Sequence, residues 1–163
     1  MNPLRMDAPG TLRPRLREAR AADIDTMVDL LAELFALEAE FAPDPAVQRR
    51  ALVALLGAPQ IGTLFVAEVA GATVGMVSLL YTLSTALGGR VAWLEDMVVA
   101  RPARARGVGD ALIAHAVACA QRHGCARVSL LTDADNVNAQ RFYGRAGFTR
   151  SPMVLMRRFF EDA

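Results

Sequence analysis

The sequence has few cysteines and almost no net charge, and both shortages restrict the class of protein to which it can belong. Its two cysteines, Cys119 and Cys125, belong to no CxxC pair and to no Cys/His cluster with metal-ligand spacing. This usage argues against a disulfide scaffold or a metal site, and it indicates reduced thiols in a cytoplasmic protein. The formal net charge is +1 over 163 residues. We therefore expect no nucleic-acid partner and no attachment to a membrane.

The sequence also lacks a targeting segment and a membrane-spanning run. Residues 1–13 carry Pro3, Pro9 and Gly10 but no apolar stretch, which predicts a flexible tail rather than a signal peptide. Residues 69–89 contain no charged side chain, but glycines interrupt them. That pattern favours part of a β-hairpin over a membrane helix. No repeat, low-complexity tract or linker divides residues 14–163, so we predict one domain there.

Apolar periodicity predicts an α+β order of helices and strands. Asp23 stands where a helix N-cap is expected, before an apolar stripe with helical spacing. Prolines end this helix, and glycines follow two later ones. The predicted elements are a strand at 16–19, helices at 24–35 and 46–56, strands at 64–69, 72–83 and 91–99, a helix at 110–123, a strand at 126–131, a helix at 137–146 and a strand at 148–156. The helical crossover after the strand ending at Val99 predicts that this strand and the next are parallel neighbours.

A basic, glycine-containing loop precedes the helix predicted at 110–123. The first N–H groups of a helix have no helical partner, and the helix dipole is positive at that end. Gly107 and Gly109 allow a ligand to approach the backbone, and Arg104 and Arg106 add positive charge. The loop suits a pyrophosphate, although a solvated turn with ordinary arginines fits the same spacing. It matches neither GxxxxGKS/T nor GxGxxG, so we expect no nucleoside triphosphatase.

This loop and a second block together resemble the GNAT superfamily of N-acetyltransferases. Arg104-x-x-Gly107-x-Gly109 is similar to the acyl-CoA loop of that family, Gln/Arg-x-x-Gly-x-Gly/Ala. The opening Arg17-Glu18-Ala19-x-x-x-Asp23 is similar to the family's first strand and helix start. The second block stands in the family order at the family separation, and it reads Asn136-x-x-Ala139-x-x-Phe142-Tyr143-x-x-x-Gly147-Phe148.

The resemblance implies a fold and a co-substrate. The implied GNAT-like fold has a central, mixed, mostly antiparallel sheet, splayed between its two parallel middle strands and flanked by about four helices. The implied co-substrate is acetyl-CoA, with no metal. Ala105 stands where many members have glycine, which predicts an altered loop conformation at most. The residues implied to bind acetyl-CoA are Met97, Val98, Val99, Arg104, Ala105, Arg106, Gly107, Val108, Gly109, Asp110, Asn136, Ala139 and Tyr143.

Two adjacent acids, Glu95 and Asp96, interrupt an apolar strand. Strand alternation places Glu95 on the face of Met97 and Asp96 on the face of Val98. Buried acids are costly, so each marks a wet strand end, an arginine pair or a functional group. An amine must lose a proton before it attacks a thioester, and we predict Glu95 as the base and as a contact of the acceptor. The run from Leu94 to Asp96 is also similar to that of polyamine acetyltransferases.

Asn136 and Tyr143 each have a structural and a functional interpretation. Asn136 directly precedes a predicted helix, so it can cap that helix, and the resemblance implies that it contacts the pantetheine arm. Tyr143 fits a core aromatic residue whose hydroxyl is satisfied. The resemblance implies instead that Tyr143 is a general acid that protonates the departing thiolate of CoA. We predict the catalytic role for Tyr143.

The segment between the first two helices is acidic and aromatic. It carries Glu38, Glu40 and Asp44 with no basic residue, and Phe35 and Phe41 flank the first two acids. A solvated helix end explains these residues equally well. The resemblance implies that the acceptor binds near this segment, with Phe35, Glu38 and Glu95 as contacts. We therefore predict a preference for a cationic amine, held by the acids and packed on the aromatic rings.

These inferences combine into one predicted function. We expect an N-acetyltransferase that moves acetyl from acetyl-CoA to a primary amine of a small molecule or a protein lysine, by direct transfer in a ternary complex. The alternative is a CoA-binding regulatory module on the same fold with weak or no catalysis. The sequence leaves homodimer formation open.

Overall fold

The computed structural model describes residues 11–37 and 40–160. The first ten residues of the tail expected at 1–13 lie outside this range, as does Glu38. The chain divides into two compact units, Met1–Leu131 and Thr132–Ala163. Each unit is described by itself below.

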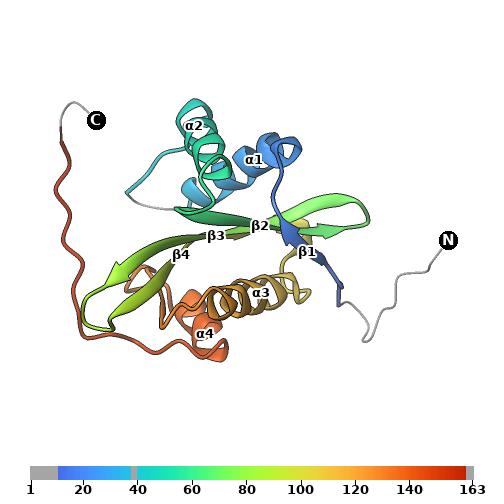
Figure 1. Cartoon of the computed structure of the whole chain (residues 1–163). Coiled ribbons are helices and arrows are strands. Elements are labelled where there is room, and N and C mark those ends of the chain that lie inside the picture. The colour runs from blue at the N-terminus through green and yellow to red at the C-terminus, as the bar shows by residue number, and fades with distance from the viewer. Residues whose placement is uncertain (1–10, 38–39, 161–163) are drawn as a thin grey trace. The chain divides into compact units, whose positions relative to one another are not determined.

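The first unit contains a five-stranded mixed sheet within the described residues. The strands are β1 (Arg15–Glu18), β2 (Gly62–Val69), β3 (Ala72–Ser84), β4 (Gly89–Val99) and β5 (Val128–Leu130), and they lie side by side in that order (Figure 1). Neighbours are antiparallel from β1 to β4, whereas β4 and β5 are parallel. The predicted parallel pair is therefore confirmed, and the structure has the mixed sheet that the sequence predicts.

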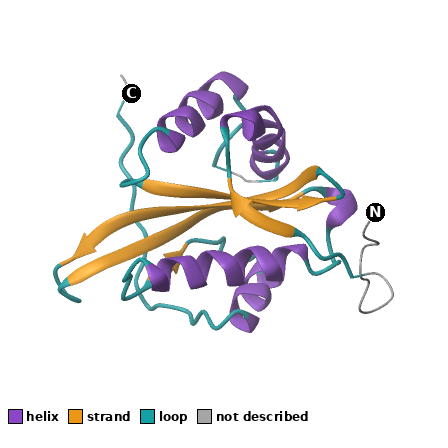
Figure 2. Cartoon of the chain, turned by 45° about the vertical axis from the view of Figure 1, so that its right-hand side comes forward, coloured by secondary structure: helices purple, strands orange, loops and turns teal. Residues whose placement is uncertain are grey.

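Helices cover both faces of this sheet (Figure 2). A short 3-10 turn η1 (Ala21–Asp23) leads into α1 (Ile24–Phe35), which packs with α2 (Pro45–Leu56) on one face, while α3 (Val108–Arg122) covers the other. Another 3-10 turn, η2 (Arg101–Ala103), precedes α3. On the α1 face, one fully buried cluster joins helix and strand side chains: Met27, Val28, Leu30, Leu31, Leu52, Leu64, Val66, Met76 and Val98.

Local sequence explains where several elements begin and end. Asp44 accepts hydrogen bonds from the backbone N–H groups of Ala46 and Val47, and Pro45 occupies the first turn, so α2 starts there. After α3, Gly124 has a φ of +72°, a left-handed conformation that ends the helix at little cost. Asp23 does not cap α1 through its side chain, contrary to the sequence-based expectation. Its carboxylate is used instead by Arg17 and by the Arg20 N–H.

A bulge interrupts β4 at the two acids. Met76 of β3 pairs with Val98, and Ser78 pairs with Glu95, so Val77 alone stands opposite the two residues Asp96 and Met97. The extra residue breaks the alternation of side chains along β4. Asp96 itself has a φ of +53°, in the left-handed region. The even alternation predicted across these acids is therefore wrong.

The strand predicted at 148–156 is not formed. The described residues from Phe148 onward have no regular secondary structure, and those from 149 to 160 are exposed. A strand needs a neighbour that pairs with its N–H and C=O groups, and Pro152 offers no N–H. Apolar composition alone does not supply such a neighbour. The parallel pair of β4 and β5 consequently ends the described sheet instead of lying in its middle.

The second unit contains one described helix, α4 (Val137–Arg145). Asn136 caps it, because its side-chain oxygen accepts from the Ala139 N–H at 3.0 Å. At the other end, Gly147 has a φ of +90° and follows the helix, as the sequence predicts.

Candidate functional site

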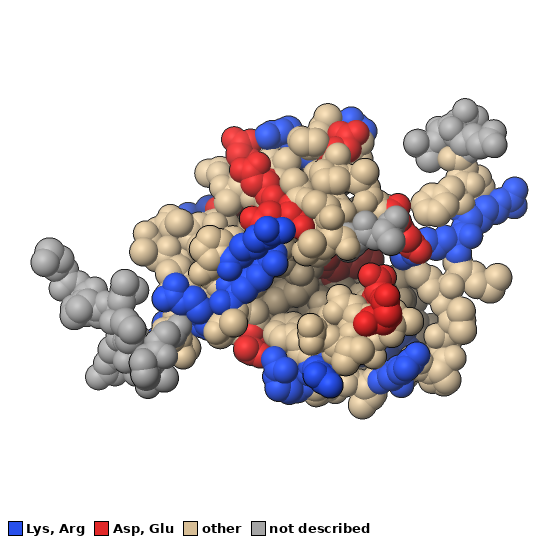
Figure 3. All heavy atoms as spheres, turned by 180° about the vertical axis from the view of Figure 1, so that it is seen from behind, with Lys and Arg blue, Asp and Glu red and all other residues tan. Residues whose placement is uncertain are grey.

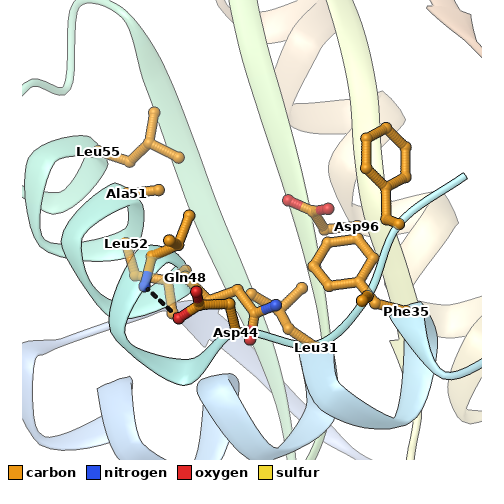
Figure 4. A pocket seen from close by; sticks show the side chains of 11 residues that line it. Leu31, Phe35, Asp44, Gln48, Ala51, Leu52, Leu55 and Asp96 are labelled. Carbon is orange, nitrogen blue, oxygen red and sulfur yellow. Dashed lines mark hydrogen bonds between the residues drawn. The ribbon is translucent and has the colours of Figure 1, made fainter. Parts of the chain in front are cut away.

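A pocket of about 250 Å³ lies in the first unit, between the α1 and α2 helices and strand β4 (Figure 4). Two helical stripes form its walls, because residues four apart lie on one helix face. The full lining is Leu31, Phe35, Phe41, Ala42, Asp44, Val47, Gln48, Ala51, Leu52, Leu55 and Asp96.

Asp96 is the acid that β4 contributes to the pocket wall. Figure 4 shows its carboxylate pointing from the sheet toward α2. Its Oδ2 accepts a hydrogen bond from the hydroxyl of buried Ser78 at 3.3 Å, and the same hydroxyl lies 3.0 Å from the Glu95 carbonyl oxygen. Burial, and to a lesser degree the neighbouring charge of Glu95, raises the pKa of Asp96 to about 6, against the lowering effect of the Ser78 bond. Asp96 can therefore exchange a proton near neutral pH.

Glu95 lies on the same face of the sheet but not in the pocket lining. It stands opposite Ser78, and residues opposite each other across a ladder share a face. Met76 and Ser78 also share that face, so Glu95 is on the side of Val98 and α1, not on the side that strict alternation gives. Its side chain is exposed. The structure thus gives the role of pocket acid to Asp96 and leaves Glu95 as its charged neighbour.

The other predicted acceptor contacts divide into two groups. Phe35 lines the pocket, and its ring lies 6.0 Å from that of Phe41. Asp44 also lines the pocket, but its carboxylate is occupied by the first turn of α2. Glu38 lies outside the described residues. The acidic character expected of this segment is therefore weaker in the pocket than the sequence indicates.

The loop before α3 adopts the backbone that its glycines permit. Gly107 has a φ of +83°, and α3 starts with no side-chain cap on its first N–H groups. Ala105 has a φ of +56°, so alanine adopts the left-handed conformation that was expected to be lost. Arg106 is exposed, as is Ala105. This helix start can donate backbone hydrogen bonds to an anion.

Arg104 is part of the framework of this loop. Its Nε donates to the Val99 carbonyl at 2.7 Å, and its Nη2 lies 3.3 Å from a carboxylate oxygen of Glu33 on α1. The guanidinium therefore joins the end of β4 to α1. Sequence reasoning predicted a phosphate contact for Arg104 and did not include this brace.

β4 has an open edge beyond its short pairing with β5. The parallel ladder covers only Ala92, Trp93 and Leu94, whereas β4 continues to Val99. Among the described residues, no strand pairs with that side of β4 after Leu94. The two strands therefore splay as expected, and backbone groups near Met97 are left for an extended ligand.

In the second unit, the structure brings Tyr143 together with two other aromatic side chains. The Tyr143 ring lies 5.1 Å from that of Phe142 and 6.0 Å from that of Phe148. Burial raises the pKa of Tyr143, so its phenol keeps its proton at neutral pH. Asn136 and the Ala139 N–H satisfy each other in the α4 cap.

Sequence reasoning missed the residues that complete the pocket. Ser78, Ala51, Leu52 and Leu55 were not singled out, because a serine in a strand and an apolar helix stripe are ordinary features. The one usable signal was the adjacent pair of acids in an apolar strand. Strict alternation already places Asp96 on the face of Val98, which is the pocket face. The bulge that brings Glu95 onto the same face has no local sequence signal.

Other kinds of site are not evident in the described part of the chain. Residues 11–37 and 40–160 contain no group of three or more His, Cys, Asp or Glu side chains that could hold a metal ion. None of the helices within them is both long and apolar enough to cross a lipid bilayer. Basic and acidic side chains occur side by side on the face drawn in Figure 3.

Comparison with known proteins identifies the class to which this fold and site belong, the acyl-CoA-dependent N-acyltransferases. The chain belongs to the Acetyltransferase (GNAT) family, whose sequence model matches residues 24–148. Acetyl transfer, with acetyl-CoA as the co-substrate of the family, follows from this membership.

Similar proteins agree with the family and the fold. The chain is 36% identical over 59 residues to an N-alpha-acetyltransferase, MAK3, of Arabidopsis thaliana; the match covers 36% of this chain and 31% of that protein, so it spans about a third of this relative. An acetyltransferase structure from Trypanosoma brucei has a TM-score of 0.70 and 27% identity over 91% of this chain and 100% of that one. An integron cassette protein from the mobile metagenome of Cole Harbour Salt Marsh has a TM-score of 0.79 and 27% identity over 91% of each chain.

Proposed function

We propose that the protein transfers acetyl from acetyl-CoA to a primary amine, by direct transfer in a ternary complex with Asp96 as the base. The observation that carries this proposal is the Asp96 carboxylate in the wall of an apolar pocket, with a pKa raised to about 6. A family acetyltransferase needs an acceptor pocket and a group that takes a proton there, and this carboxylate meets both needs. The acceptor is a small-molecule amine or an amine of a protein.

The base is needed because alkyl amines are almost entirely protonated at neutral pH. With an amine pKa of ~10.4, only about one molecule in a thousand has a free lone pair at pH 7. A carboxylate with a pKa near the working pH is ionised often enough to accept the proton and releases it readily. Asp96 satisfies this condition, because burial and, to a lesser degree, the charge of Glu95 raise the pKa of its carboxyl group. This assignment moves the role first predicted for Glu95 by one residue.

The residues of the first unit fit acetyl-CoA at two places. The start of α3, where Gly107 provides no side-chain cap to the first N–H groups, suits the pyrophosphate, helped by the charge of Arg106. The open edge of β4, at Met97 and Val99, suits the amide groups of the pantetheine arm. Acetyl-CoA supplies an acetyl group activated as a thioester. A backbone N–H of β4 is the donor that we propose for the carbonyl oxygen of that thioester.

For the second unit, we propose that Tyr143 donates a proton to the departing thiolate and that Asn136 and Ala139 contact the pantetheine arm. Support comes from the family block that these residues match and from the burial that keeps the Tyr143 phenol protonated. Asn136 performs its capping role at the same time.

The relative from Arabidopsis thaliana supports an α-amine as one acceptor class. It is named as an N-alpha-acetyltransferase, so the acceptor panel has to include a free peptide N-terminus. The panel also needs a lysine peptide, an alkyl amine and a diamine. The chain contains no lysine, so acetyl groups found on a lysine peptide cannot be confused with acetylation of lysines in the enzyme.

The test is amine-dependent release of free thiol from acetyl-CoA, with mass spectrometry of the acetylated product. We expect turnover with at least one amine of the panel, and Asp96→Asn should lower kcat by about 10²-fold or more. Asp29→Asn removes an exposed acid from α1 and should leave kcat unchanged. Binding of acetyl-CoA without turnover of any amine would favour the regulatory-module alternative instead.

A further inference from the structure

The acceptor pocket is apolar except for three side chains. Eight of its eleven lining residues are Leu, Phe, Val or Ala. On α2, the lining residues Val47, Ala51 and Leu55 recur at helical spacing and present one apolar stripe. Leu31 and Phe35 make the corresponding stripe on α1. Most of what an acceptor contacts in this pocket is therefore hydrocarbon.

Two of the three polar lining residues take part in the start of α2. The Asp44 carboxylate accepts from the N–H groups of Ala46 and Val47 at 3.0 and 3.1 Å. The Gln48 amide, oriented to satisfy both of its ends, accepts from the Asp44 N–H at 2.9 Å and donates to the Asp44 carbonyl at 3.3 Å. Both bonds that Ala46 and Val47 donate to Asp44 go to its Oδ1, which a ligand cannot take without weakening the helix start, and the Asp44 side chain is exposed to solvent.

Asp96 is the remaining polar group, and half of its carboxylate is open. Oδ2 accepts from Ser78, whereas no side chain or backbone group of the described residues donates to Oδ1. The lining includes no Arg, Lys or His that could pair with an acid on the ligand. Among the described lining residues, Asp96 is therefore the one partly buried carboxylate available to an ammonium group.

We propose that the preferred acceptor is a primary amine attached to a single uncharged hydrocarbon group, with the nitrogen at Asp96 and the hydrocarbon between α1 and α2. This inference rests on the proposed function and specifies its acceptor. A diamine or polyamine would have to bury a second ammonium group against leucine and phenylalanine, which is unfavourable without a partner. The cationic preference that the acidic segment predicts is thus replaced by an apolar one.

The size of the pocket limits the hydrocarbon group. A volume of about 250 Å³ lies at the small end of ligand pockets, which span roughly 300–1,000 Å³. A short alkyl chain, a phenylethyl group or the side chain of one apolar amino acid suits this space. The same chemistry can come from a free amine or from a polypeptide whose first residue is apolar.

The test compares matched pairs of amines on the full chain with saturating acetyl-CoA. Hexylamine and 1,5-diaminopentane have equal numbers of heavy atoms and differ in one terminal group. We expect kcat/KM to favour hexylamine by about tenfold or more, and to rise roughly fourfold per added methylene from propylamine until the pocket is full. For a polypeptide acceptor, the same comparison uses two peptides that differ only in Leu or Lys at the free N-terminus. Whichever pair has the higher kcat/KM, the free amines or the peptides, identifies the source of the acceptor.

A charge placed on the pocket wall should reverse this preference. Ala51 lines the pocket and is exposed on α2, so Ala51→Glu should fold and offer a partner for a second ammonium group. We expect the hexylamine-to-diamine ratio to fall roughly tenfold in this variant. Ala54→Glu adds the same charge to the same helix outside the lining, and it should leave the ratio unchanged.

Binding measurements separate this inference from the proposed function. Thermal shifts with each amine, in the presence of CoA, report on the pocket without turnover. Tighter binding of hexylamine, even if no amine is acetylated, supports the apolar acceptor and counts only against the proposed activity. The inference would be overturned if the diamine bound as tightly as hexylamine or more tightly. It would also be overturned if the hexylamine-to-diamine ratio were the same in Ala51→Glu and in Ala54→Glu.

Discussion

At the scale of single residues, the backbone conformation of Asp96 has a chemical consequence. A non-glycine residue with a φ of +53° costs roughly 1–2 kcal/mol relative to ordinary strand geometry. The bulge brings Glu95 onto the pocket face, beside the Asp96 carboxylate that lines the pocket. Strained positions of this kind are often retained where they place a functional group.

The pKa of Asp96 should respond to its two neighbours in opposite directions. Glu95→Gln removes the repelling charge, so the pKa of Asp96 should fall and the acidic limb of the pH profile of kcat should move to lower pH. Ser78→Ala removes a hydrogen bond that lowers this pKa, so the limb should move to higher pH. The measurement is kcat from pH 4.5 to 8. If the acidic limb of the kcat profile lay at the same pH in the wild-type chain and in both variants, another group would be the base.

Tyr143→Phe tests the proposed acid. The substitution keeps the ring and its contacts with Phe142 and Phe148 but removes the phenolic proton. We expect kcat to fall about 10²-fold, the usual scale for a general acid, with little change in the Kd of acetyl-CoA. Activity within twofold of wild type would assign protonation of the thiolate to water or to another residue.

At the scale of elements, the start of α3 is the part of the fold that a pyrophosphate can use. The helix begins after Gly107 with no side-chain cap, so its first N–H groups are available to an anion. The splay of β4 from β5 adds a free backbone edge nearby in the sequence, after Leu94. Both features are made by main-chain groups, so side-chain identity constrains them little except at glycine.

Gly107→Glu should abolish the thermal stabilisation by acetyl-CoA. A hundredfold excess over Kd stabilises the native state by about 2.7 kcal/mol, and each kcal/mol raises Tm by about 2–4 °C in a chain of this size. The glutamate places negative charge at the anion site. Gly107→Ala is the matched control, because it has the same unfavourable φ and the same Cβ near Thr11 but no charge. Equal shifts in both variants would show that the phosphates bind elsewhere.

At the scale of the whole molecule, one ionic network joins distant parts of the first unit. Arg17 of β1 lies 2.7 Å from Asp23 of η1 and 3.1 Å from Glu68 of β2, and Thr73 of β3 donates to Asp23 at 3.2 Å. Asp23 is buried, and the hydrogen bond from Arg17 is the main cause that lowers its pKa to about 2. The network therefore couples folding of three strands to the ionisation of one carboxyl group.

Stability should consequently depend on Asp23 in acid. Because its folded pKa is below its unfolded value of 3.8, Asp23 contributes about 2 kcal/mol above pH 4, and this contribution is lost as the pH falls toward 2. Asp23→Asn should lower the free energy of urea unfolding by roughly that amount at pH 7 and by little at pH 2. Asp25→Asn, which removes an exposed partner of Arg49, should change it by less than about 0.5 kcal/mol. A pH-independent effect of Asp23→Asn would assign its role to packing.

Several parts of the molecule follow from local sequence alone. Asp44 and Pro45 start α2, glycines follow α3 and α4, and Asn136 caps α4, because each rule involves only neighbouring backbone groups. The loop before α3 and the block from Asn136 to Phe148 likewise indicated the family together, because they stand in the family order and at the family separation.

Tertiary structure decided that the two acids share one face and where the sheet ends. Strict alternation from Val98 already places Asp96 on the α1 face, whereas Glu95 was predicted from the cost of burying an acid and from the family resemblance. The bulge, which depends on the register between β3 and β4, brings Glu95 onto that same face. The apolar residues after Phe148 form no strand, because a strand exists only where another strand satisfies its N–H and C=O groups. The acidic segment predicted a pocket that prefers a cationic amine. In the structure, the Asp44 carboxylate accepts a hydrogen bond at the start of α2, and most of the side chains that line the pocket are hydrocarbon. Capping and turn rules describe hydrogen bonds between residues that are close in sequence. A pocket is made by segments that are distant in sequence. Its chemistry depends on which polar groups remain without a hydrogen-bond partner once those segments pack together.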